Sequence, residues 1–195
     1  TIDVGGLFGI AHYGNQFVDC SCSCDVEIYA AEEADEAQEI GGIAGVWNNG
    51  GADVVMTNCE FTGIVTTNID RETVWYSNLV GRPYSATGTG RLIIDGIEMI
   101  ANGVGIKDGE YYVTSAQGLL WVEDQADNFF AGKTIKLAND IDMAGVAIAN
   151  PITFWNPENK TTFDGENHTI SNLTMSTTST EKKPFSLFTG TANIK

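Results

Sequence analysis

The residues best suited to chemistry in this chain are four cysteines, three of which alternate with serines over residues 20–24. Side chains on an extended strand alternate between its two faces, so these three thiols share one face. When the repeats described below are aligned, Cys20 lies opposite Cys59 and Cys22 lies opposite the apolar Phe61. The thiol face therefore points to a core, where a free cysteine behaves as a small hydrophobic residue. We predict buried thiols at Cys20, Cys22, Cys24 and Cys59, with a Cys20–Cys59 disulfide as the alternative.

Metal binding by these thiols is disfavoured by their arrangement. Three cysteines on one strand point in the wrong directions for a tetrahedral site, and CxxC and Cys/His spacings are absent. No P-loop, HExxH motif, nucleophile elbow or dinucleotide-binding fingerprint occurs in the sequence either. The sequence thus predicts no catalytic residue, no cofactor site and no metal site.

Carboxylates in the second half offer a different chemistry. Asp140 and Asp142 share a strand face, and a turn that precedes His168 contains Asp164 and Glu166. Paired acids could cleave glycosidic bonds, or could bind Ca²⁺ beside a basic residue as in polygalacturonate chemistry. We favour the other interpretation, in which Asp140 and Asp164 stabilise tight turns by accepting hydrogen bonds from the backbone. A single histidine in a turn also serves more often in packing or hydrogen bonding than as a ligand.

Aromatic residues near loops could stack on sugar rings. These are Trp47, Tyr76, Tyr84 and Trp155. Aromatic side chains at such positions equally often cover the core, so they do not by themselves indicate a carbohydrate site.

Two repeats must position the cysteines. The Gly-Gly pairs at 5–6 and 41–42 lie 36 residues apart, whereas Cys20 and Cys59 lie 39 residues apart. Three extra residues therefore sit in the loop around residues 48–51. Insertions confined to loops are typical of stacked solenoid coils, because strands must align from coil to coil while loops need not. We expect inward residues such as Leu7, Ile43 and Cys20 to form continuous ladders.

Elements in the rest of the chain follow from periodicity and turn residues. Residues 29–39 are acidic and alanine-rich and are interpreted as a solvated excursion, and residues 101–110 as a connection between two segments, 1–100 and 111–195. Ser115 is the expected N-cap of one helix, from Ala116 to about Asn128, which covers an open end of the core. Strands are expected at 92–95, 97–100, 111–113, 134–137, 141–143, 168–170, 173–175 and 185–188.

Composition narrows the class of protein. The formal net charge of −16 argues against nucleic acid and anionic membrane surfaces, both of which attract basic patches. No apolar run approaches the roughly 20 residues of a membrane span, so we expect no membrane insertion. With 22 glycines and few helical patterns, the chain is expected to be all-β. Because Thr1 is not an initiator methionine, we expect a mature or excised piece.

An ordered series of motifs in the second half points to a family. The motifs are Ser-Ala-Gln-Gly-Leu-Leu-Trp (115–121), Gly-Lys-Thr-Ile-Lys-Leu-Ala-Asn-Asp-Ile-Asp-Met (132–143), Pro-Ile-Thr (151–153), Phe-Asp-Gly-Glu-Asn-His-Thr-Ile-Ser-Asn-Leu (163–173) and Leu-Phe-Thr-Gly (187–190), and the first half adds Gly-Leu-Phe-Gly (6–9) and Gly-Ile-Ala-Gly (42–45). The second-half series resembles the opening segment of bacterial, Bacteroidales-type cell-surface β-helix proteins that carry GLUG repeats, and the first-half motifs resemble the repeats themselves. The resemblance implies a right-handed parallel β-helix with one capping helix, located outside a bacterial cell.

The order of segments departs from that family, in which the helix-bearing segment comes first. The chain is then the end of one β-helix joined to another, a unit of a tandem array, or a permuted solenoid. We expect the strands near Lys195 and Thr1 to belong to adjacent coils, within one chain or between neighbours. The expected function is a non-catalytic structural or adhesive module. Its expected partners are copies of itself stacked head to tail, or glycans or proteins of host or bacterial surfaces. The rival is a polysaccharide-active enzyme using Asp/Glu pairs.

Overall fold

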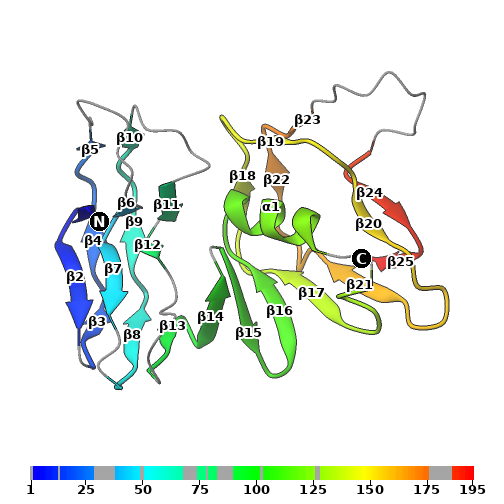
Figure 1. Ribbon diagram of the computed structural model, residues 1–195, viewed down its shortest axis with the longest axis horizontal. Coiled ribbons are helices and arrows are strands. Elements are labelled where there is room, and N and C mark those ends of the chain that lie inside the picture. The colour runs from blue at the N-terminus through cyan, green and yellow to red at the C-terminus, as the bar shows by residue number, and fades with distance from the viewer. Residues whose placement is uncertain are drawn as a thin grey trace. The chain divides into compact units, whose positions relative to one another are not determined.

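Two compact units make up the chain, Thr1–Asn102 and Gly103–Lys195. The structure, a computed structural model, describes residues 2–12, 14–28, 38–48, 51–67, 74–77, 79–82, 90–101, 103–125, 128–175 and 186–195. These residues are mostly β, with one helix (Figure 1). Most of the acidic 29–39 segment and Tyr84 lie outside the described residues.

Short strands run throughout the first unit and fall into three repeats. Repeat 1 contains β1 (Ile2–Gly5), β2 (Phe8–His12), β3 (Gln16–Val18), β4 (Ser21–Cys22) and β5 (Val26–Ile28). Repeat 2 contains β6 (Gln38–Gly41), β7 (Ala44–Asn48), β8 (Val54–Thr57), β9 (Glu60–Phe61) and β10 (Val65–Thr67). Repeat 3 contains β11 (Val74–Ser77), β12 (Val80–Arg82) and β13 (Leu92–Ile94), and β14 (Ile97–Ala101) follows.

Corresponding strands of successive repeats pair in parallel. β1, β6 and β11 form one ladder, β2, β7 and β12 a second, and β3, β8 and β13 a third, while β4 pairs with β9 and β5 with β10. Gly5 lies opposite Gly41, and Cys22 lies opposite Phe61. The alignment predicted from the sequence is therefore confirmed at both ends of the repeat. The third repeat was not predicted.

The middle repeat contributes several completely buried residues to the core of the first unit. Ile40, Ile43 and Met56 are completely buried, because strands on both sides cover that repeat. Leu7 is the equivalent of Ile43 and donates its backbone N–H to the Ile43 carbonyl, yet its side chain is 48% exposed. Leu7 thus stands in the expected register with Ile43, but its side chain is exposed because, within the described residues, repeat 1 is covered on one side only.

Two antiparallel hairpins interrupt the parallel pattern. β13 and β14 are joined at Asp95-Gly96, and β15 (Val104–Lys107) and β16 (Glu110–Val113) at Asp108-Gly109. All four turn residues have positive φ, which the turns of two-residue hairpins require and which Asp-Gly readily supplies. The predicted connection at 101–110 therefore contains a strand, and the unit boundary falls just before it.

In the second unit the parallel pattern resumes. The strands after α1 (Ala116–Asp124) are β17 (Thr134–Leu137), β18 (Ile141–Asp142), β19 (Ala147–Ile148), β20 (Ile152–Phe154), β21 (Thr161–Asp164), β22 (Ile170–Ser171), β23 (Thr174–Met175), β24 (Phe188–Gly190) and β25 (Ala192–Ile194). β17 pairs with β16 and β21, β21 with β25, β18 with β22, β19 with β23 and β20 with β24. The strand predicted at 185–188 thus lies later in the chain, at β24. Leu119, Ile135, Met143 and Phe154 form part of the buried core.

The helix begins as predicted, after Ser115, but ends at Asp124, four residues before the expected end. Gln125 has extended backbone, and its N–H bonds to the Val122 carbonyl and closes the last turn. The Ser115 hydroxyl makes no capping bond, and it is buried with no hydrogen-bond partner among the described residues. Ser115 therefore occupies the cap position without the cap interaction.

Candidate functional site

Asp140 and Asp142, two of the predicted candidate acids, accept hydrogen bonds from different backbone N–H groups. Asp140 Oδ1 accepts a bond from the Thr169 N–H at 2.9 Å and lies 3.2 Å from Nδ1 of His168. Asp142 Oδ1 accepts from the Ala144 N–H at 2.9 Å and from Asn172 Nδ2 at 2.8 Å. The structure thus places both acids in turn and inter-strand contacts.

Of the other two acids, Asp164 also accepts a backbone N–H, whereas the Glu166 carboxylate pairs with a lysine. Asp164 Oδ1 accepts from the Glu166 N–H at 3.1 Å, which is the expected turn bond, and its other oxygen lies 3.7 Å from Lys195 Nζ. Asp140 and Asp164 therefore do bond to backbone, although Asp140 bonds across to the next repeat and not within its own turn. No group of three or more His, Cys, Asp or Glu that could hold a metal ion is found in the described ranges.

Hydrogen bonding to the charged form lowers the pKa of two of these acids. For Asp140 the main cause is the Thr169 N–H, followed by His168, and for Asp142 it is the Asn172 amide, followed by the Ala144 N–H. A general acid in glycoside hydrolysis needs the opposite shift, a raised pKa that keeps its proton at neutral pH. These environments favour ionised, structural carboxylates.

Two acids and a base do converge elsewhere on the second unit. Lys136 Nζ lies 2.8 Å from Glu110 Oε2 and 2.9 Å from Glu166 Oε1. These ion pairs, led by that with Glu110, hold the pKa of Lys136 well above its usual range. The three residues come from β16, β17 and the turn after β21, which are neighbours in one sheet. The geometry is that of a cross-strand ion ladder.

Carboxylates also join the repeats of the first unit. Asp25 accepts the Ile64 N–H at 3.0 Å, and Asp53 accepts the Arg91 N–H at 2.9 Å and its guanidinium at 2.6 Å. The guanidinium is the main reason that the pKa of Asp53 is lowered. Acids of one repeat thus bind backbone N–H groups of the next, which accounts for part of the acidic excess.

A column of left-handed corner residues runs through the same unit. Asp19, Asn58 and Asp95 all have φ near +50°. Asp19 and Asn58 occupy equivalent positions in repeats 1 and 2, whereas Asp95 lies one residue earlier in the register of repeat 3. Asn58 donates its side-chain amide to Asp19 at 2.7 Å and its backbone N–H to Asp95 at 2.8 Å. Asn and Asp tolerate this backbone conformation best among residues with a side chain, and here they also bond to one another.

The four cysteines are free and differ in exposure. Cys22 is buried, Cys20 and Cys59 are half-buried, and Cys24 is exposed. The prediction of a fully buried set is therefore wrong for Cys24, and it is only partly met at Cys20 and Cys59. Burial is the main cause that raises the pKa of Cys59.

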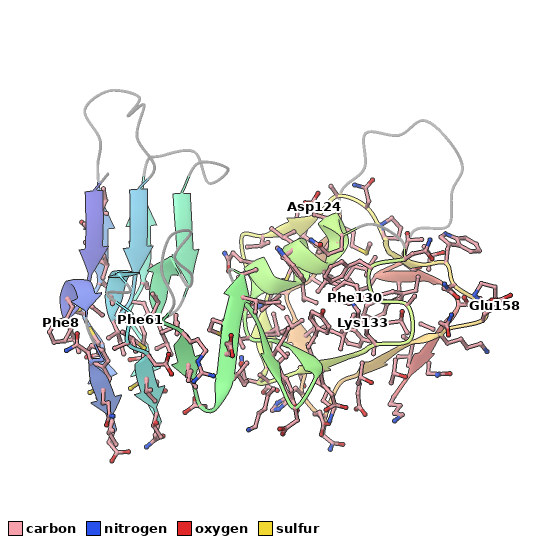
Figure 2. All side chains as sticks on the ribbon, turned by 60° about the horizontal axis from the view of Figure 1, so that its bottom comes forward. Phe8, Phe61, Asp124, Phe130, Lys133 and Glu158 are labelled. Carbon is pink, nitrogen blue, oxygen red and sulfur yellow. The ribbon has the colours of Figure 1, made fainter. Side chains whose placement is uncertain are left out.

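The outer side of repeat 1 is apolar. Leu7 and Phe8 are 48% and 46% exposed, whereas their equivalents in repeat 2, Ile43 and Ala44, are completely buried. Figure 2 shows Phe8 at the outer side of this repeat. Val18 is also exposed, at 56%, but its equivalent Thr57 is exposed as well, so Val18 lies on an outward face. β2 is an edge strand that pairs only with β7 among the described strands, which leaves Leu7 and Phe8 exposed; we call this pair the open edge.

The described residues leave the suggested sugar-stacking residues largely untested. Trp155 is 58% exposed, but the side chains of Trp47 and Tyr76 lie outside the description. An aromatic cluster that was not predicted from the sequence lies beside α1 (Figure 2). Lys133 Nζ lies 4.0 Å from the ring centroid of Phe129 in this cluster. The cluster contains Tyr111, Trp121, Phe129 and Phe130 in edge-to-face contacts. The consecutive aromatic residues Phe129 and Phe130, between the helix and β17, were the sequence feature that could have indicated this cluster.

Comparisons with protein-family models, curated proteins and solved structures give no match to this chain. No helix in the described part of the chain is long and apolar enough to cross a bilayer.

Proposed function

We propose that this chain is a non-catalytic, extracellular structural or adhesive module of a bacterial surface protein, built as a right-handed parallel β-helix. The observation that carries this proposal is the parallel pairing of equivalent strands from one repeat to the next. In the first unit Ile2, Gln38 and Val74 lie in one register, two steps of 36 residues. Such stacking gives each repeat contacts mainly with its neighbours, as in solenoid proteins.

Dispersed acids support a non-catalytic role. Asp140, Asp142 and Asp164 bond separately to backbone and side-chain partners, so none is left to act as a paired acid and base. Contacts of this kind stabilise repeats and need no substrate.

Further copies of the same kind of repeat are the partner that fits the open edge. A strand with one paired side presents unpaired backbone groups, and it recruits another strand unless it is covered. In repeat 2 the equivalent residues Ile43 and Ala44 are buried under repeat 1, whereas nothing in the described residues covers Leu7 and Phe8 in the same way. A second copy stacked head to tail would bury both residues, which favours a fibre or a tandem array at the cell surface.

Sedimentation velocity over a range of protein concentrations tests this role. We expect the wild type to form larger species as concentration rises, and Phe8→Asp to remain monomeric because a charge cannot be buried at the joint. Val18→Asp is the matched control, since Val18 is similarly exposed in the same repeat but faces outward. A wild type that stays monomeric, or equal effects of both variants, would contradict the proposal.

A polysaccharide-active enzyme is the second candidate, favoured only by the meeting of Glu110, Lys136 and Glu166. Incubation with acidic and neutral polysaccharides, followed by measurement of reducing ends, separates the two roles. We expect no cleavage. Cleavage that is abolished in Glu166→Gln, with an unchanged melting temperature, would replace the structural role with an enzymatic one.

A further inference from the structure

Two thiols of repeat 1 converge on one point. Cys22 Sγ and Cys24 Sγ lie 2.7 Å apart, and Cys24 Sγ also lies 3.9 Å from the Gly6 carbonyl oxygen. A disulfide bond is about 2.05 Å long, so little movement of the sulfurs is needed to form one. We propose that Cys22 and Cys24 form a redox modification site, a dithiol that closes to a disulfide within repeat 1.

Gly6 provides the space for the two sulfurs. A Cβ atom at this position would lie 2.7 Å from Cys22 Sγ and 2.9 Å from Cys24 Sγ, closer than packed atoms allow. The absence of a side chain at Gly6 therefore leaves room for both sulfurs. Because both sulfurs rest against the same glycine, they are held facing each other.

Repeat 2 fills the equivalent place differently. Cys22 lies opposite Phe61, and Gly63 is the residue that corresponds to Cys24. A Cβ atom at Gly63 would collide with the backbone carbonyl of Cys24 and would also lie 3.0 Å from Cε2 of Phe61, so the Cys24 backbone and the phenylalanine ring leave no room for a side chain there. One large side chain and a glycine thus replace two thiols. A core at this position therefore does not require Cys22 and Cys24. What distinguishes the two residues from their equivalents in repeat 2 is the reactivity of their thiols.

The exposures of the two residues assign an order to the reaction. Cys24 is exposed and meets the oxidant first, while Cys22 is buried beside it. With a small disulfide such as oxidised glutathione, Cys24 thiolate attacks one sulfur, which forms a mixed disulfide and releases one glutathione. Cys22 thiolate then attacks Cys24 Sγ, which forms the Cys22–Cys24 bond and releases the second glutathione. Two cysteine thiols are oxidised, one glutathione disulfide is reduced, and the two protons end on the released thiols.

The surroundings favour a modification site over a thiol catalyst. The pKa of Cys24 is raised, chiefly by its hydrogen bond with Cys22. Catalytic cysteines of disulfide oxidoreductases instead have lowered pKa values in electropositive surroundings. Exchange at this pair is therefore expected to be slow at neutral pH. None of these contacts depends on the role proposed above for the repeats.

The test uses the full chain with Cys20→Ser and Cys59→Ser, so that only this pair remains. After equilibration with mixtures of reduced and oxidised glutathione, free thiols are alkylated and the protein is digested before aspartates, which isolates residues 19–24. We expect this peptide either to carry two alkyl groups or to be lighter than the dithiol by two hydrogens. We expect little bound glutathione, because the second thiol displaces it.

Single replacements separate pairing from independent reactivity. In that background Cys22→Ser should accumulate a stable glutathione adduct at Cys24, since no thiol remains to displace it. Cys24→Ser should leave Cys22 largely unmodified because of its burial. Two independent adducts in the background protein would overturn the proposal, as would two free thiols at a glutathione ratio that modifies Cys24 in the Cys22→Ser variant. In Cys20→Ser alone, a link between the peptides of residues 19–24 and 53–69 would show that Cys59 pairs with Cys22 or Cys24, which would also overturn the proposal.

Discussion

Individual carboxylates in this chain act as hydrogen-bond acceptors that connect one repeat to the next. Asp25, Asp53 and Asp140 each accept a backbone N–H from a residue 29–39 positions away. A carboxylate can accept several bonds while its charge stays partly in water, and charge-assisted bonds are stronger than neutral ones. At the residue scale, the acidic composition is thus part of the architecture.

Stability should therefore fall in acid. The pKa values of Asp53, Asp140 and Asp142 are lowered in the folded chain from the usual 3.8, so protonation is harder in the folded than in the unfolded state. Their contribution is complete above about pH 3.8 and is lost as pH falls through the lowered values. Urea unfolding from pH 7 to pH 2.5 should show the loss, and Asp142→Asn should reduce its size. A free energy of unfolding that stays constant down to pH 2.5 would contradict this.

Ser115 should be dispensable despite its cap position. Replacing an N-cap serine by alanine usually costs about 0.5–2 kcal/mol, but the Ser115 hydroxyl makes no cap bond and is buried without a partner. We expect Ser115→Ala to leave the free energy of unfolding unchanged or to raise it, as measured by urea denaturation.

Thr161→Val provides the matched control, because the Thr161 hydroxyl is also buried but donates to the Phe130 carbonyl at 2.8 Å. Its loss should cost about 1 kcal/mol. A larger cost for Ser115→Ala than for Thr161→Val would show that Ser115 does cap the helix.

At the scale of elements, the helix is fixed to the β15–β16 hairpin by a close approach of two backbones. A Cβ atom on Gly118 would collide with the Gly103 carbonyl oxygen, and Gly103 itself has φ +73°. In an exposed helix, Gly→Ala stabilises by about 1 kcal/mol. Here the backbone contact requires glycine, so packing overrides propensity.

Gly118→Ala should accordingly destabilise the second unit by about 1–3 kcal/mol, the usual cost of overpacking a core. Thermal unfolding followed by circular dichroism measures the effect. Asp124→Ala, an exposed substitution in the last turn of the same helix, is the control and should be neutral. A stabilised Gly118→Ala would mean that the two backbones separate without penalty.

Much of the element pattern could be predicted, because it is written in local periodicity. The strand at Thr134–Leu137, the start of α1 and the Cys22–Phe61 register all follow from residue types and spacing. The third repeat was missed because Ser77 replaces the first glycine of the Gly-Gly pair, although it keeps the register of Gly41. Asp108-Gly109 was a hairpin signal that the glycine-rich surroundings concealed.

Site properties were harder to predict, because they depend on what covers each repeat. Alternation places the three thiols of residues 20–24 on one face, but it does not reveal that Cys24 is exposed while Cys22 is buried. Likewise Leu7 and Ile43 are alike in sequence and opposite in exposure. Local pattern determines which way a side chain points, whereas burial depends on neighbours far away in the sequence.

At the scale of the whole chain, the stacking of strands near the two ends remains a prediction. β1 and β25 each lie at the end of a ladder in the described residues, and the sequence near Lys195 continues naturally into that of β1. We expect these strands to be neighbours, either within one molecule or between two.

Fluorophores attached to the two ends distinguish the two versions. Energy transfer in doubly labelled protein at high dilution indicates a permuted solenoid. Transfer that appears only when singly labelled molecules are mixed at high concentration indicates head-to-tail stacking. Absence of transfer under both conditions would mean that the two ends never meet.

The parallel ladder of β1, β6 and β11 also has a mechanical consequence. Its hydrogen bonds run from one repeat to the next, so tension applied along the stack pulls on the few bonds of one joint and not on every strand at once. A repeat that detaches releases 36–39 residues of chain, which extend to about 130 Å at roughly 3.5 Å per residue. The first unit should therefore lengthen under load in equal steps, absorbing work while its remaining repeats stay folded.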